Sequence, residues 1–88
     1  MRHDIKIHEE YLYDVATGRK NFEVRKNDRN YKAGDTVIMR EYNPTKEAYT
    51  GRAIEIKITY VLENYPALEP GYCVFGFILL TDIYHSRK

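Results

Sequence analysis

The sequence predicts an α+β domain in which five to six strands accompany one helix between the first two strands. Three observations predict this class: polar and apolar residues alternate in several short segments, helical spacing occurs in one segment, and the connections are short. The 88 residues suffice for one hydrophobic core and therefore for a single domain, residues 1–88. These patterns alone fit either a small barrel or an open sheet.

The N-terminal part of the chain is expected to form a strand, a helix and a second strand. Residues 3–7 alternate between polar and apolar side chains, which is typical of a strand. A helix is expected over 9–17, because acidic residues open its first turn and Gly18 ends it in a left-handed conformation. The second strand is expected over 21–25. Residues at helical spacing give the helix its apolar face: Tyr11, Leu12, Val15 and Ala16.

The rest of the chain is expected to contain three further strands. A continuous apolar run predicts a strand over 36–42, and turn residues over 43–46 lead into a hairpin that closes through 49–51. Residues 52–62 form the clearest alternating strand. A loop with two prolines then leads to the last strand, 72–81.

Two further features belong to the C-terminal part. Gly76 lies inside the last predicted strand, where a glycine indicates a bulge or a tight barrel bend. Residues 82–88 follow that strand and are expected to form a frayed tail. No internal repeat, low-complexity tract or linker interrupts the chain, which agrees with one domain.

Positive charge is concentrated in one segment. Residues 19–32 carry six basic residues and two acidic ones, a net charge of +4, which leaves −3 for the other 74 residues. A local basic patch of this kind fits a phosphate-bearing ligand, but it is too small for nonspecific wrapping of a duplex. The alternative interpretation is a solvated loop and edge strand that charge keeps soluble.

Several classes of protein are not expected. The longest apolar stretch, 73–80, is interrupted by a glycine and is too short to span a membrane, and the N-terminus has no apolar signal segment. The single cysteine, Cys73, cannot form an internal disulfide, and the three histidines lack the spacing of metal ligands. We expect a cytoplasmic protein, a monomer, without metal, cofactor or membrane partner.

The most informative segment is Gly18-Arg19-Lys20-Asn21-Phe22-Glu23-Val24-Arg25, which reads Gly-x-Lys-x-x-Glu-x-Arg. Alternate side chains of a strand share a face, so Glu23 and Arg25 are expected about 7 Å apart on one surface, opposite the two apolar residues. Lys20 stands at the strand entrance and reaches the same spot. Three charges so close together suit a single ligand, and the alternative is an exposed strand with a self-neutralising ion pair.

This motif resembles the signature of ASCH domains, small members of the PUA-like superfamily. The similarity continues through Gly34-Asp35 ahead of an apolar strand, the Glu41-Tyr42 pair and the Tyr49-Thr50-Gly51-Arg52 turn, and covers about residues 3–81. The chain is similar to a compact ASCH-like family of bacterial and phage proteins whose function is undefined. The resemblance implies a PUA-like β-barrel in which the motif lines a cleft proposed to bind RNA or a nucleotide-like ligand.

The side chains of the motif have the chemistry that such a ligand requires. Arg25 offers a planar guanidinium to phosphate or carboxylate and stacks on bases, and Glu23 accepts hydrogen bonds from a base or a ribose, or else holds its neighbours. Lys20 neutralises a phosphate or, if desolvated, acts as a base. Further candidates for ligand binding are Arg29, as a second cation, and two of the nine tyrosines, Tyr42 and Tyr60.

Two other functions stay open at this point. Some ASCH relatives are amidohydrolases of acylated cytidines that use the motif lysine, a threonine and a glutamate, and others cleave RNA. Lys20 matches that pattern, but Glu23 stands where those enzymes have the threonine nucleophile. Catalysis here would therefore use Lys20 as base and Glu23 as proton carrier. The second alternative is a non-catalytic accessory that binds a protein partner, with Glu23 and Arg25 only bracing the fold.

Overall fold

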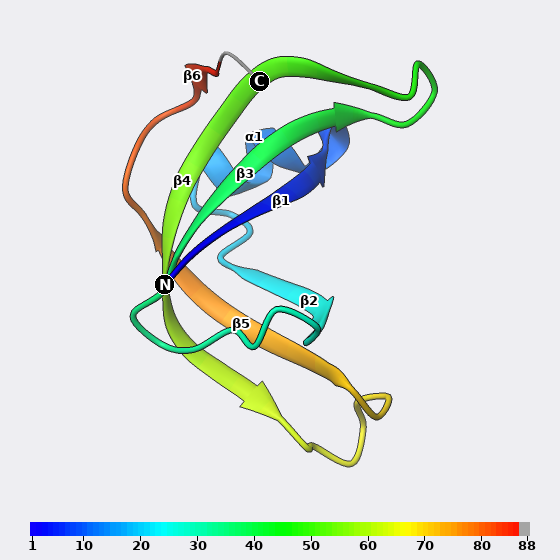
Figure 1. The fold of residues 1–88 in the computed structure, drawn as a ribbon. Helices are drawn as coiled ribbons and strands as arrows, with labels where there is room; N and C mark the ends of the chain where they lie inside the picture. Colours follow the sequence, from blue (N-terminus) through cyan, green and yellow to red (C-terminus); the bar gives the residue numbers. More distant parts are fainter. Residues whose placement is uncertain (87–88) are drawn as a thin grey trace.

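The computed structural model describes residues 1–86 (Figure 1). The elements follow in the order β1 (Arg2–His8), α1 (Glu9–Ala16), β2 (Phe22–Lys26), β3 (Thr36–Asn43), β4 (Ala48–Glu63), β5 (Tyr72–Leu79) and β6 (Tyr84–His85). The strands form one mixed sheet in the order β1-β3-β4-β5-β2, with β6 paired to β4. β1 and β3 are parallel, whereas the other neighbouring strands are antiparallel. The predicted α+β class, with one helix between the first two strands, is confirmed.

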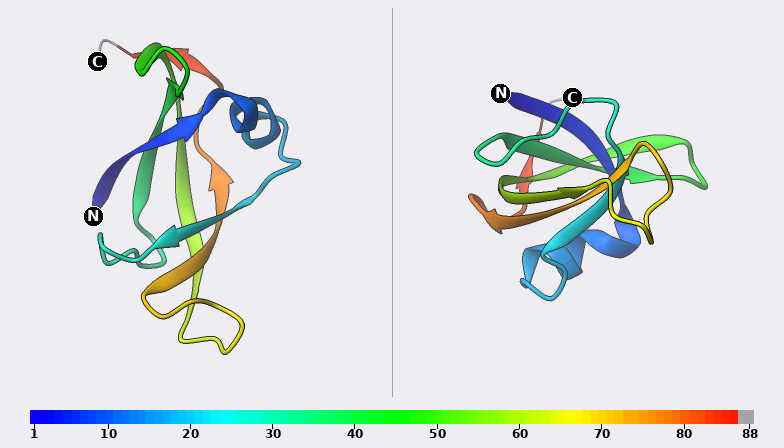
Figure 2. Two further views of the ribbon diagram at one scale, coloured as in Figure 1. Left: turned by 90° about the vertical axis from the view of Figure 1, so that its right-hand side faces the viewer. Right: turned by 90° about the horizontal axis from the view of Figure 1, so that it is seen from below.

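The long strand β4 gives the sheet its curvature. Its first half pairs with β3 and its second half with β5, so the sheet curls into a half-barrel whose two edges are β1 and β2 (Figures 1 and 2). The register shifts between Ile58 and Tyr60, directly where Tyr60 faces Gly76. The irregularity predicted at Gly76 therefore lies in the partner strand, and such bulges increase the local twist of a sheet.

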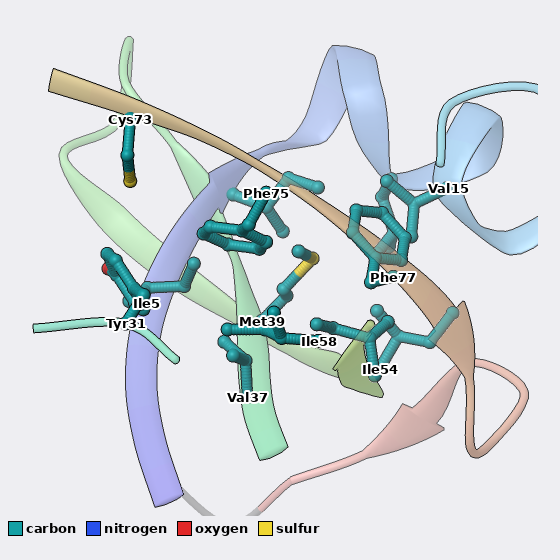
Figure 3. Packing of buried hydrophobic residues seen from close by; sticks show 13 residues of the cluster. Ile5, Val15, Tyr31, Val37, Met39, Ile54, Ile58, Cys73, Phe75 and Phe77 are labelled. Atoms are coloured by element: carbon teal, nitrogen blue, oxygen red, sulfur yellow. The ribbon is translucent and has the colours of Figure 1, made fainter. Parts of the chain in front are cut away.

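The hydrophobic core fills the concave side of the half-barrel. Alternate residues of β1, β3, β4 and β5 point into it, and α1 closes it by packing against β1 and β3 (Figure 3). Tyr31, from the connection between β2 and β3, inserts its ring against Phe75 with 4.8 Å between the ring centroids. Among the fully buried side chains are Ile7, Leu12, Val15, Val37, Met39, Ile54, Ile56, Ile58, Cys73 and Phe75.

The β3–β4 hairpin is tighter than the sequence predicts. Its turn ends before Ala48, so residues 49–51 belong to β4 and do not form the turn. The side-chain oxygen of Asn43 accepts hydrogen bonds from the backbone N–H groups of Thr45 and Lys46, at 2.9 and 3.0 Å. Glu47 completes the turn with a φ of +50°. This Asx-type turn confirms the turn predicted over 43–46, whereas the closure predicted through 49–51 is wrong, because those residues lie inside β4.

The tail also differs from its prediction. Residues 84–85 form β6 and pair with Arg52 and Ala53 of β4, and the Tyr84 hydroxyl donates a 2.7 Å hydrogen bond to Glu55. These contacts order most of the segment that was expected to fray, while residues 87–88 of that segment lie outside the described residues. None of the described helices is long and apolar enough to cross a membrane.

Candidate functional site

A cleft of about 590 Å³ opens between β1 and β2, the two edges of the half-barrel. The end of β1 forms one wall, β2 forms the other, and the start of α1 and Lys20, in the connection before β2, complete it. Its charged side chains comprise four cations and a single carboxylate. The lining residues are Lys6, Ile7, His8, Tyr11, Lys20, Phe22, Glu23, Val24, Arg25, Lys26 and Tyr72.

The end of α1 sets the position of Lys20. Gly18 adopts a φ of +79°, a conformation that glycine reaches without steric cost, and its N–H donates to the carbonyl of Val15. The chain then folds back, because the N–H of Lys20 donates a 2.9 Å hydrogen bond to the carbonyl of Asp14. This short return places the lysine beside the start of β2 with its side chain in the cleft.

The three motif charges form one connected network. The Lys20 ammonium donates a 2.8 Å hydrogen bond to Oε1 of Glu23, and Nε of Arg25 lies 3.6 Å from Oε2 of the same carboxylate. Glu23 is only 6% exposed, so its carboxylate depends on these two cations for its charge balance. Lys20, Glu23 and Arg25 are therefore brought together as the sequence indicates, and their role in ligand binding stays a prediction.

Arg25 also joins the two edges of the sheet. Its Nη2 donates a hydrogen bond to the backbone carbonyl of Lys6, on the strand opposite β2. One guanidinium thus contacts the carboxylate of Glu23 and the backbone of β1. Because arginine has five N–H donors, donors remain for a ligand in the cleft.

The two faces of β2 are reversed relative to an ordinary edge strand. Glu23 and Arg25 are paired with Phe75 and Cys73 of β5, so they lie on the concave face that carries the core. The apolar residues Phe22 and Val24 are exposed on the convex face. A strand normally places apolar residues inward, so β2 instead presents charged groups to the core side of the sheet and apolar ones to the outside.

Aromatic rings surround the cations of the cleft. The Lys20 ammonium lies 5.2 Å from the ring centroid of Tyr11 and 5.5 Å from that of Phe22. The ammonium of Lys6 lies 4.1 Å from the ring centroid of Tyr42. Contacts of this kind hold a cation in place while its charge remains available to an anion.

The structure separates the remaining predicted binding residues from the cleft lining. Tyr42 borders the cleft through its contact with Lys6. Arg29 lies on the exposed connection after β2. Burial raises the pKa of the Tyr31 phenol, and the positive charge of nearby Arg29 opposes that rise. Tyr60 lies on the convex face of β4 and is 65% exposed. These three residues are not among those that line the cleft.

Several lining residues escaped the sequence analysis. Lys6 and His8 occupy the end of a short strand, and no motif marks them. Tyr11 was assigned to the apolar face of the helix, yet it points to the cleft. Lys26 could have been found from the basic run, whereas Tyr72 reaches the cleft only because β5 pairs with β2. The described residues contain no group of three His, Cys, Asp or Glu side chains suited to a metal ion.

A second charged network lies apart from the cleft lining and supports the fold. Glu41 is fully buried and accepts hydrogen bonds from Nε and Nη2 of Arg52 at 2.8 and 2.9 Å and from the Thr50 hydroxyl at 2.6 Å. Burial raises the pKa of the Glu41 carboxyl, but the hydrogen bonds from Arg52 and Thr50 and the charge of Arg52 outweigh it, so the pKa is lowered overall. This pair joins β3 to β4 next to their hairpin.

Comparison with known proteins places the chain in a family. Residues 2–77 match a domain of unknown function, DUF3850. The chain belongs to the DUF3850 family. This DUF3850 chain is 43% identical over 61 residues to the uncharacterized 12.9 kDa protein in the GpA 3′ region of Escherichia phage P2. The match covers 69% of the chain and 54% of the phage protein, so the chain spans about half the length of that relative.

Proposed function

We propose that the protein is an ASCH-like, PUA-like module that binds RNA or a nucleotide-like ligand in the cleft between β1 and β2. The convergence of Lys20, Glu23 and Arg25 on that cleft carries the proposal. The volume of about 590 Å³ lies within the range of small-ligand sites, and the excess of cations favours an anion. The Gly-x-Lys-x-x-Glu-x-Arg motif supports the assignment to the ASCH family within the PUA-like superfamily.

Each motif residue has a separate task in this proposal. Arg25 and Lys20 neutralise phosphate, and Lys6 and Lys26 add charge at the two walls. Glu23 accepts one hydrogen bond from Lys20 and is held by the charge of Arg25 at 3.6 Å, and its other lone pairs accept hydrogen bonds from a base amino group or a ribose hydroxyl. A carboxylate held by two cations offers acceptors without repelling the anion nearby.

Titration of single-stranded RNA and of a nucleotide panel, at low and increasing salt, tests this function. Lys20→Met keeps the length of the side chain but removes its charge, so we expect several-fold weaker binding. We also expect the slope of log affinity against log salt to become shallower by roughly 0.7 for each phosphate that the variant no longer neutralises, as for other single strands. Lys46→Met, on the exposed β3–β4 turn, serves as the control and leaves both quantities unchanged. Absence of binding across the panel at low salt contradicts the proposal.

Hydrolysis of an amide on a modified pyrimidine nucleoside is the second candidate. The 2.8 Å contact between Lys20 and Glu23 favours it, since an amine beside a carboxylate can move a proton and orient a water. A screen of acylated cytidines and short RNAs, with Lys20→Ala alongside the native protein, tests it. Turnover that Lys20→Ala abolishes supports catalysis at this cleft, whereas turnover that survives the change assigns the activity to another site or to a contaminant.

A further inference from the structure

The convex face of the β2–β5–β4 part of the sheet presents two aromatic rings in one row. Phe22 of β2 is paired with Gly76 of β5, and Gly76 is paired with Tyr60 of β4. Paired residues of neighbouring strands project from the same face, so both rings stand on the convex face of the sheet. Phe22 is 45% exposed and Tyr60 is 65% exposed, which leaves both rings accessible from outside.

The glycine between the two rings leaves a gap in the layer of side chains. Neighbouring strands lie about 4.8 Å apart, so the backbones that carry Phe22 and Tyr60 are separated by about 10 Å. This separation between the two backbones leaves room over Gly76 for one planar base to lie against a neighbouring ring. A side chain larger than hydrogen at position 76 would occupy this space.

The floor of the gap also has polar groups. A Cβ atom built on Gly76 would lie 3.6 Å from Oγ1 of Thr59 and 3.8 Å from the backbone oxygen of Asn21. A hydroxyl and a carbonyl thus border the place where a base edge would rest. An aromatic platform with hydrogen-bonding groups at its base is the arrangement by which sheet proteins hold unstacked bases.

The charges around this face complement a polyanion. Lys57 is paired with Ile78 at one end of the face, and Lys26 is paired with Tyr72 at the other. The ammonium of Lys20 lies 5.5 Å from the centroid of the Phe22 ring, so this ring adjoins both the cleft and the convex face. The paired convex-face positions of the three strands, from Lys57 to Lys26, carry no carboxylate: Phe22, Val24, Lys26, Lys57, Tyr60, Leu62, Tyr72, Val74, Gly76 and Ile78.

We propose that single-stranded RNA crosses the edge of β2, with phosphate in the cleft and a base over Gly76 between Phe22 and Tyr60. This inference rests on the proposed function, because the cleft holds the phosphate end of the same strand. It assigns a role to Tyr60, which lies outside the cleft. It also accounts for the outward position of Phe22, whose ring contacts Lys20 of the cleft and stands beside Gly76 on the convex face. The ligand is then a strand of at least two nucleotides, and a mononucleotide occupies the cleft alone.

We call the surface formed by Phe22, Gly76 and Tyr60 the platform. Binding of three probes distinguishes its contribution from that of the cleft: a short oligouridylate, uridine monophosphate, and a base-free ribose-phosphate oligomer. Tyr60→Ala removes the stacking ring, and we expect about tenfold weaker binding of the oligouridylate, in line with the loss of one stacked base. Binding of uridine monophosphate and of the base-free oligomer stays the same. Tyr13→Ala is the matched control, since Tyr13 is a similarly exposed tyrosine (68%) on α1 and is not a lining residue of the cleft.

Gly76→Val fills the gap and provides a second, independent variant. A Cβ atom at this position has neighbours only at ordinary contact distance, and valine suits a strand, so we expect a folded variant, and its melting temperature is measured beside binding. Oligouridylate binding should fall about as far as in Tyr60→Ala, again without a change for uridine monophosphate. Tyr60→Trp preserves stacking and gives a protein with no tryptophan a single indole, which can be excited apart from the tyrosines; its emission should be quenched by the oligouridylate but not by the base-free oligomer.

The outcomes distinguish the platform from the cleft. If Lys20→Met weakens binding of all three probes while Tyr60→Ala and Gly76→Val weaken none, the cleft function stands and the platform is overturned. If no probe binds the native protein, the proposed function fails and the platform fails with it. A change of self-association in Tyr60→Ala, measured by sedimentation, with unchanged RNA binding also overturns the platform and assigns this face to a second copy of the chain.

Discussion

At the scale of single residues, Arg25 has two separable contributions. Its guanidinium balances the charge of Glu23 and donates to the carbonyl of Lys6, which stabilises the fold, and its remaining donors face the cleft. Because Lys20 also holds Glu23, removal of the Arg25 side chain does not leave the carboxylate alone. A residue of this kind is expected to affect binding more than stability.

Substitution of Arg25 measures its contribution to stability and its contribution to ligand binding separately. For Arg25→Ala we expect a decrease of about 1 kcal/mol in the free energy of unfolding, because the side chain is 28% exposed and Glu23 keeps one partner. Binding of a phosphate-bearing ligand should fall tenfold or more, since charged hydrogen bonds contribute about 1.5–3 kcal/mol. Urea unfolding and ligand titration measure the two effects, and Arg25→Lys, which keeps the charge without the planar fork, should restore binding only in part.

The opposite pattern would identify a bracing role. Breaking a fully buried ion pair typically costs about 3–5 kcal/mol. A destabilisation of that size in Arg25→Ala, without any change in ligand binding, would mean that Glu23 and Arg25 only hold the barrel together and that the protein acts through another surface.

At the scale of elements, β2 shows what a local pattern can and cannot predict. Alternation correctly separates Glu23 and Arg25 from Phe22 and Val24, because side chains of a strand alternate whatever surrounds it. The pattern does not say which set points inward. That choice follows from the pairing of β2 with β5, a strand much later in the chain, and it puts the charged set on the core side.

The hairpin between β3 and β4 illustrates a different limit. Gly51 indicated a turn, and its φ of +94° is indeed one that favours glycine, yet it lies inside β4. The strand continues through it because Thr50 and Arg52 both donate hydrogen bonds to the buried Glu41 of β3. The turn itself lies over 43–46 as predicted, but side-chain contacts between residues nine to eleven positions apart, which a periodicity argument does not detect, accompany the continuation of β4 through residues 49–51.

At the scale of the whole molecule, long-range pairing produces the cleft. Residues 2–8 of β1 pair in parallel with 36–42 of β3, and residues 22–26 of β2 pair with β5. These two pairings bring the strands before and after α1 to opposite edges of one curled sheet (Figure 2). Lys20, Glu23 and Arg25 could be predicted together because they are close in sequence. Their cleft partners on β1 and β5 could not, since only the topology makes them neighbours.

The stability of the whole domain should depend on acid through two buried carboxyl groups. The hydrogen bond from His3 lowers the pKa of Asp35 below its usual 3.8, and the pKa of Glu41 is lowered below 4.5 by Arg52 and Thr50 despite burial. Below their usual pKa values, Asp35 and Glu41 of the unfolded chain bind protons, whereas the same groups of the folded protein stay ionised to lower pH. Their contribution to stability is therefore complete above about pH 4.5 and disappears as the pH falls through the lowered folded-state pKa values.

Glu41→Gln isolates one of these carboxyl groups. At pH 7 the variant should lose about 1–3 kcal/mol of unfolding free energy, because an amide cannot accept from Arg52 and Thr50 as a carboxylate does. As the pH falls through and below about 4.5 the difference from the native protein should shrink, since Glu41 of the unfolded native chain takes up a proton that the folded carboxyl resists, whereas the amide does not titrate. Urea unfolding at pH 7, 5, 4 and 3 measures both curves, with Glu69→Gln, at an exposed loop position, as the control that follows the native curve. Parallel curves for Glu41→Gln and the native protein down to pH 3 would refute the assignment, because they would mean that Glu41 titrates alike in the folded and unfolded chains.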